Sequence, residues 1–118
     1  MRQLSLALVL LFAPHALARV VGWSEAPTIR RVIDATRAPV AGCVEDYGRD
    51  TDRDSLSFWA QLRVAPDGSI ANVTFDRDGL LNDGQRYCVR RTLEALQFPP
   101  PHAEQRLPIH YVVEQRAR

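Results

Sequence analysis

The chain has 118 residues, of which 46% are hydrophobic, and its 15 basic and 14 acidic side chains leave a formal charge of +1. Every basic residue is arginine. A nearly neutral chain without a face of one sign argues against binding to nucleic acid or to an anionic membrane, and its length suits one domain with a modest core.

Residues 1–18 have the pattern of a signal peptide. Arg2 precedes an apolar run over 4–12, and a small-x-small sequence ends at Ala18. A run this short cannot cross a bilayer core, which takes about 20 helical residues, and a buried N-terminal helix is the alternative. We expect cleavage between Ala18 and Arg19, export to the periplasm or the medium, and a mature chain with no membrane span.

Two cysteines, Cys43 and Cys88, lie in the expected mature part. In an oxidising compartment an even pair in a small domain predicts a disulfide. Loop-closure entropy over a separation of this size gives a stabilisation of roughly 4 kcal/mol. The spacing excludes a C-x-x-C redox motif, and two thiols with scattered histidines make no zinc pattern.

After a lead-in over 19–27 that contains Trp23, helical periodicity begins. We expect Thr28 to cap this helix and Gly48 to end it. Pro39 removes one helical hydrogen bond and clashes with the preceding turn, which predicts a kink or two short helices that meet near Arg37. The apolar stripe that defines the helix recurs at helical spacing: Ile29, Val32, Ile33, Val40, Cys43, Val44 and Tyr47.

From Ser57 the period changes to two, which predicts strands. One strand runs to Val64, with Phe58 on one face and Trp59 on the other. The sequence Pro66-Asp67-Gly68 predicts a turn, and a second strand over Ser69–Asp76 completes a hairpin.

A second helix is expected over Asp83–Gln97, capped by Asn82 or Asp83 and stopped by three prolines. A third strand is expected over about Arg106–Glu114, with one apolar face. Pro108 cannot donate to a strand ladder, so this strand is expected at a sheet edge. The stripe of the second helix is Cys88, Val89, Thr92, Leu93 and Leu96, and that of the third strand is Leu107, Ile109, Tyr111 and Val113.

The order of elements is therefore helix, strand, strand, helix, strand. Two helices side by side on one face of an antiparallel sheet would bury all five apolar stripes and bring Cys43 to Cys88. The predicted fold class is α+β, with a three-stranded antiparallel sheet in the order second, first, third.

Four groups of residues carry a family resemblance. The first is Cys43 with Glu45 and Tyr47, and the others are 66–70 (PDGSI), 88–91 (CVRR) leading into 98–101 (FPPP), and 107–111 (LPIHY). Over about 28–115 the chain resembles the C-terminal domain of TonB, and in detail the AgmX/PglI C-terminal group of myxobacterial envelope proteins. Residues 116–118 are a basic tail beyond the likeness.

The resemblance implies a protein-binding module of the cell envelope that captures an extended partner segment along its final strand. It does not imply an enzyme. The chain departs from the TonB pattern because it carries no retained membrane anchor and no long proline-rich spacer, so energy transduction is not expected.

Two other motifs predict no site. Asp50, Asp52 and Asp54 begin like a calcium loop, but Ser55 and Gln61 stand where the pattern needs glycine and glutamate. The mature histidines, His102 and His110, have no triad spacing, and no G-x-S-x-G motif occurs. We expect no catalytic residue, metal, cofactor or small-molecule substrate.

The candidate contact surfaces are the final strand and Trp59. The unpaired edge of the strand could accept a partner strand, unless Pro108, the tail or a homodimer protects it. Trp59 marks a second contact surface, unless the lead-in or a loop covers it. The expected partner-binding residues are Arg106, Leu107, Ile109, His110, Tyr111, Val112, Val113, Glu114 and Trp59.

Three functions compete on this basis. The first is an exported module that binds an extended protein segment at the strand edge. The second is a structural, inhibitory or dimerising domain that uses the face around Trp59. The third is a small hydrolase with an unrecognised site.

Overall fold

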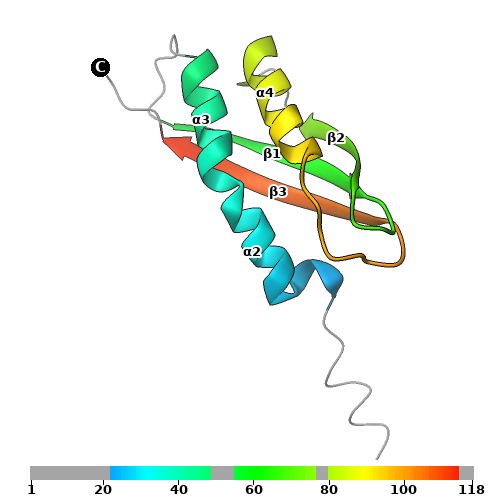
Figure 1. The fold of residues 1–118 in the computed structure, drawn as a ribbon. Coiled ribbons are helices and arrows are strands. Elements are labelled where there is room, and N and C mark those ends of the chain that lie inside the picture. The colour runs from blue at the N-terminus through cyan, green and yellow to red at the C-terminus, as the bar shows by residue number, and fades with distance from the viewer. Residues whose placement is uncertain (1–21, 49–54, 77–79, 115–118) are drawn as a thin grey trace, which may run out of the picture.

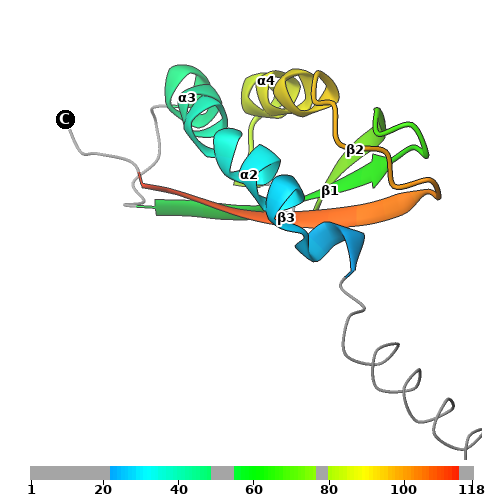
Figure 2. The same ribbon diagram turned by 60° about the horizontal axis from the view of Figure 1, so that its bottom comes forward.

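The computed structural model describes residues 22–48, 55–76 and 80–114, which form one α/β sandwich of two layers (Figure 1). The expected leader, its cleavage position, the Asp50–Asp54 motif and the 116–118 tail lie outside these ranges. Helices cover one face of a three-stranded antiparallel sheet ordered β2-β1-β3 (Figure 2). The predicted α+β fold and strand order are confirmed. In chain order the elements are η1 (Trp23–Glu25), α2 (Pro27–Ala35), α3 (Arg37–Tyr47), β1 (Ser55–Val64), β2 (Ile70–Asp76), α4 (Asp83–Glu94) and β3 (Gln105–Glu114).

Alternation along the strands sorts side chains between the core and the open face. In β1 the residues Phe58, Ala60 and Leu62 are buried, whereas Trp59 is exposed. In β3 the odd-numbered residues from 107 to 113 are buried and the even-numbered residues are exposed. Because side chains alternate between the faces of a strand, this pattern leaves the face away from the helices to solvent.

The first helical segment breaks at Thr36, between α2 and α3. Pro39 accounts for the position, because its ring crowds the carbonyl of Ala35 and it has no N–H to donate there. This confirms the second predicted alternative, two short helices meeting near Arg37. The expected cap at Thr28 is wrong. The helix begins at Pro27, two residues before the start that a cap at Thr28 implies, with Ala26 at the cap position and no side-chain cap. The fixed φ of Pro27 suits the first helical position.

The end of α3 is tied to the start of α4. Asn82 caps α4 in a capping box with Gln85, and its side chain also donates to the carbonyl of Tyr47 (2.7 Å). Buried Gln85 donates to the carbonyl of Val44 (2.9 Å). Tyr47 itself is 55% exposed, so its assignment to the apolar stripe is wrong. Its ring lies beside Gly84 rather than in the core.

A disulfide joins Cys43 of α3 to Cys88 of α4, with the Cα atoms 5.5 Å apart. The predicted pairing is present, and it links two helices that pack side by side over the sheet (Figure 1). Buried side chains from all three strands, from the helices and from the segment after α4 complete the core: Ile29, Val40, Val44, Phe58, Leu62, Val73, Val89, Leu93, Phe98, Ile109 and Tyr111 among others.

The hairpin turn is bound to the segment after α4. Gly68 has φ +91° and accepts a hydrogen bond from the N–H of Phe98 (2.9 Å). Gln97 forms a β-bridge with Ser69, so α4 ends at Glu94 and not at Gln97 as expected. Asp67 accepts from the N–H and the hydroxyl of Ser69, which lowers the pKa of its carboxyl group.

Replacing Gly68 should show that this turn tolerates no side chain. A Cβ there would lie 2.0 Å from the carbonyl oxygen of Phe98, on a backbone conformation that L-residues avoid. Gly68→Ala should lower the free energy of unfolding by roughly 1–3 kcal/mol in denaturant titrations. Gly42→Ala is the control, because a Cβ in α3 meets nothing within 4 Å, and it should raise stability by up to about 1 kcal/mol.

Removing the disulfide should cost a large share of the stability. The double variant Cys43→Ser, Cys88→Ser should unfold with a free energy lower by roughly 4 kcal/mol than the oxidised protein. Equilibrium denaturation with and without reductant measures the change. Reductant should destabilise the wild type and leave the cysteine-free double variant unchanged; a wild type whose stability reductant does not alter would contradict the disulfide.

Candidate functional site

The outer edge of β3 presents the backbone groups of its even-numbered residues. Arg37 Nη1 donates to the carbonyl oxygen of His110 (3.0 Å), so this carbonyl points away from β1. Pro108, two residues earlier, shares that direction and needs no N–H there. The hairpin gives the same direction. The N–H of Ala65 donates to Ser69 on the β2 side, so the backbone groups of the odd-numbered residues of β1 point to β2 and those of its even-numbered residues point to β3. The groups of Arg106, Val112 and Glu114 therefore also point outward.

The first half of this edge is partly closed. The groove between α2 and β3 runs along Leu107–His110, with α2 beside the strand (Figures 1 and 2). Pro108 offers no donor, and Arg37 occupies the carbonyl of His110. The expectation that Pro108 protects the edge therefore holds for this half of the strand.

The second half of the edge is open. Within 22–48, 55–76 and 80–114, no hydrogen bond reaches the outward backbone groups of Val112 or Glu114, or the N–H of His110. The side chain of Val112 is 60% exposed. A free strand edge of this kind is the template to which another strand pairs. We call His110–Glu114 the free edge.

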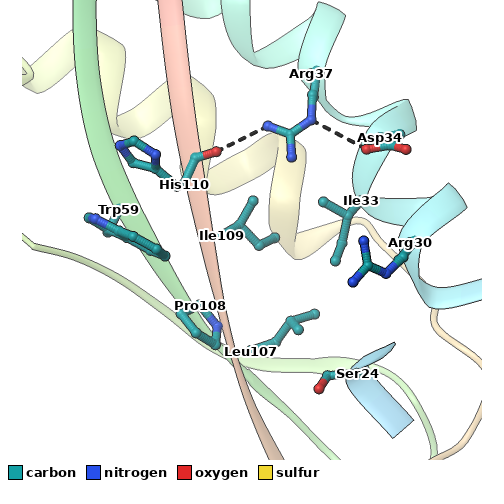
Figure 3. Close-up of a pocket in the computed structure, with 10 residues that line it drawn as sticks. All are labelled: Ser24, Arg30, Ile33, Asp34, Arg37, Trp59, Leu107, Pro108, Ile109 and His110. Carbon is teal, nitrogen blue, oxygen red and sulfur yellow. Dashed lines mark hydrogen bonds and ion pairs between the residues drawn. The ribbon is translucent and has the colours of Figure 1, made fainter. Parts of the chain in front are cut away.

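The helix break places two arginines beside β3. Arg37 lies directly after the break, with its guanidinium 5.6 Å from the ring centre of Tyr111 and 3.4 Å from Asp34. Arg30 comes from α2, two turns before, and its side chain reaches toward the strand (Figure 3). The groove has a volume of 390 Å³, and its apolar wall includes Ile33 and Ile109.

A buried hydroxyl pair anchors the break to the strand. Thr36 is 2% exposed, and its hydroxyl oxygen lies 2.6 Å from the carbonyl of Ile33 and 2.6 Å from the phenol oxygen of Tyr111. Burial raises the pKa of Tyr111, and the Thr36 hydroxyl and the Arg37 charge offset only part of that rise. The Thr36–Tyr111 pair therefore sets where α2 lies relative to β3.

On the open face of the sheet, Trp59 stacks on His110. Their ring centres are 4.7 Å apart at 24°, and they are directly opposite in the β1–β3 register. This is a non-hydrogen-bonded pair, in which side chains approach closely. Trp59 remains 43% exposed beside the described part of the lead-in, 22–27, in which Trp23 packs on Phe98 with ring centres 5.5 Å apart.

The predicted contact residues thus separate into two sets. Arg106, His110, Val112 and Glu114 present exposed side chains on the open face, where His110 stacks on Trp59. The second set, the odd-numbered residues of β3, is at most 4% exposed, and its side chains lie in the core: Leu107, Ile109, Tyr111 and Val113. The outward backbone groups of the strand belong to the even-numbered residues between them. The sequence analysis missed Arg30 and Arg37. Helical periodicity places them off the apolar stripe, but it does not show that their side chains reach β3.

Within the described ranges, the other polar residues singled out in the sequence do not gather into a site. No cluster of His, Cys, Asp and Glu within the described ranges could hold a metal ion. His102 lies in a turn at φ 68°, with its N–H bonded to the carbonyl of Pro66 (3.2 Å), away from His110. Across the same ranges, no helix has the length and apolar character needed to cross a membrane.

Replacing Tyr111 should test the hydroxyl pair. Tyr111→Phe removes one buried hydrogen bond and leaves Thr36 bonded to Ile33, so the free energy of unfolding should fall by about 1 kcal/mol. Because its pKa is raised, wild-type Tyr111 contributes stability that is full below about pH 10 and falls as the pH rises further.

Denaturation at about pH 8 and about pH 11 should show that Tyr111→Phe loses less stability between them than the wild type does. Tyr87→Phe is the control, because Tyr87 is 63% exposed, and its pH dependence should match the wild type. Equal alkaline losses in all three proteins would contradict the role of the buried phenol.

Comparison of the chain with protein-family models, with curated proteins and with solved structures gives no match. The resemblance to the TonB C-terminal domain therefore stays a prediction from the sequence.

Proposed function

We propose that this protein is an exported, non-enzymatic binding module of the cell envelope, which captures an extended segment of a partner protein by strand addition at the free edge, His110–Glu114. The observation that carries the proposal is the pair of outward backbone groups at Val112, which meets no hydrogen-bond partner in the described part of the chain.

The environment of the free edge suits strand addition. The strand is long, at Gln105–Glu114, and ten consecutive residues pair it in register with β1, so it is a rigid template. A rigid template lowers the ordering cost of binding, and main-chain hydrogen bonds supply affinity without a specific side chain. Selectivity would come from alternate side chains, which meet His110, Val112 and Glu114 on the open face.

Export is supported by the leader pattern of residues 1–18 and by the disulfide. A disulfide between a buried Cys43 and a partly buried Cys88 fits an oxidising compartment, because cytosolic thiols are kept reduced. The TonB-like features of the sequence agree with an envelope protein. The intact mass of the exported protein should lack the first 18 residues and two cysteine hydrogens.

The exposed side chains of Trp59 and Val112 support a second candidate function. They lie on one face of the sheet, 43% and 60% exposed, with His110 stacked on the indole ring. Exposed aromatic and aliphatic side chains that lie together mark contact surfaces. A structural, inhibitory or dimerising domain would use this face rather than the strand edge.

One substitution separates the two functions. Val112→Pro removes the outward N–H, and its neighbour Tyr111 already has the extended backbone that precedes proline, so the fold should persist. Peptides selected from a random display library on the wild-type domain should lose binding to Val112→Pro. Their affinity should fall far less with Val112→Thr, which keeps the N–H and the branched side chain. Fluorescence anisotropy measures both.

Trp59→Ala gives the complementary result. It should leave most of the affinity for selected peptides if they bind by strand addition, and abolish it if they bind the open face. Thermal melts confirm that each variant is folded. A selection that enriches no peptide sensitive to Val112→Pro would falsify strand addition.

A further inference from the structure

We propose that the captured segment carries an acidic side chain just after its pairing stretch, and that the groove between α2 and β3 receives this side chain beside Arg30 and Arg37. The inference rests on strand addition at the free edge and adds the direction and the charge of the partner segment.

The position of the groove sets the direction. It runs along Leu107–His110 and therefore begins where the free edge ends. The sheet is antiparallel throughout, and antiparallel pairing is slightly the more stable arrangement. A segment added antiparallel along Glu114 to His110 continues toward Leu107. Its residues on the C-terminal side of the pairing stretch then enter the groove.

The charges of the groove favour a carboxylate. Arg37 is held by Asp34 (3.4 Å) and by the His110 carbonyl (3.0 Å). Arg30 forms no ion pair with any residue that the structure describes, and its guanidinium points toward β3 from α2 (Figure 3). The two guanidinium groups of Arg30 and Arg37 outnumber the single carboxylate of Asp34, so the groove has a net positive charge. Arginine binds carboxylates through paired N–H donors, which makes it the stronger partner for an acidic side chain.

The apolar wall of the groove strengthens this preference. Ile33 is half-buried and Ile109 is 3% exposed, and Pro108 and Trp59 lie at the rim. The guanidinium groups of Arg30 and Arg37 remain exposed to solvent, so the wall adds apolar contact for the partner side chain and does not shield the charge pair. A glutamate, whose methylene groups contact the wall while its carboxylate reaches Arg30, fits these surroundings.

The same charges argue against a second copy of this chain in the groove. In antiparallel self-pairing across the free edge, the residues that follow Glu114 would continue toward Arg30 and Arg37. Those residues include Arg116 and Arg118. Like charges brought together at an interface lower affinity, so the occupant is a segment of a different protein that carries the opposite charge.

The test begins with the random peptide display selection on the domain. Selected peptides should carry Asp or Glu on the C-terminal side of an alternating, strand-forming stretch more often than the unselected library does. One enriched peptide is then synthesised with glutamate and with glutamine at that position, amidated at its C-terminus to remove the terminal carboxylate. The glutamate peptide should bind about fivefold more tightly, and this margin should shrink as salt is added.

Variants of α2 locate the effect. Arg30→Gln should lower the affinity for the glutamate peptide to that for the glutamine peptide. Arg31→Gln removes the neighbouring charge outside the groove and should preserve the fivefold preference. Peptides that bind and are lost with Val112→Pro, yet show no preference for glutamate, would overturn the acidic partner and leave strand addition standing. Selection of no peptide sensitive to Val112→Pro would overturn both.

Discussion

The break between α2 and α3 is the constraint on which the candidate site depends. Pro39 forbids a continuous helix through Ala35, and the chain turns at Thr36 with a buried hydroxyl pair to Tyr111. An unbroken helix would have carried residues 27–35 along the axis of α3, away from the edge of β3. The turn instead places α2 beside that edge, which creates the groove and brings Arg37 to the carbonyl of His110.

Covalent and hydrogen-bond links to α4 hold α3 in place on the sheet, so the turn at Thr36 always directs α2 to the same position. The disulfide and the bond from Gln85 to Val44 tie α3 to α4, and α4 packs on the sheet through Val89 and Leu93. Each tie joins residues more than forty positions apart in the sequence. Because α3 cannot shift along the sheet, the position of Arg37 follows from the core and not from surface contacts.

Both outer strands of this small sheet are partly protected by arginine. Arg37 covers a carbonyl of β3, and Arg90 approaches the carbonyl of Val73 on β2 (3.5 Å) with its guanidinium 5.4 Å from the ring centre of Phe75. Proteins commonly place charged side chains on strand edges, because an open edge invites aggregation. The difference between the edges is length: β3 extends past its arginine for another four residues, and this extension is the free edge. A short accessible edge limits unspecific pairing and leaves room for one partner segment.

Local patterns in the sequence were enough for the elements and their faces. Alternation in β1 and β3 separated Phe58 from Trp59 and Ile109 from His110, and the turn at Gly68 and the break near Arg37 followed from backbone chemistry alone. Periodicity gave wrong predictions at the ends of elements. Tyr47 is exposed and not part of the apolar stripe, and Gln97 pairs with Ser69 of the hairpin instead of continuing the helix. Hydrogen bonds to other elements decide where a helix ends. Only the tertiary structure brought Arg30 and Arg37 to β3, Thr36 to Tyr111 across 75 positions, and Trp59 onto His110. Such pairs depend on how helices cross a sheet, and a pattern that repeats within one element carries no information about the element that lies against it.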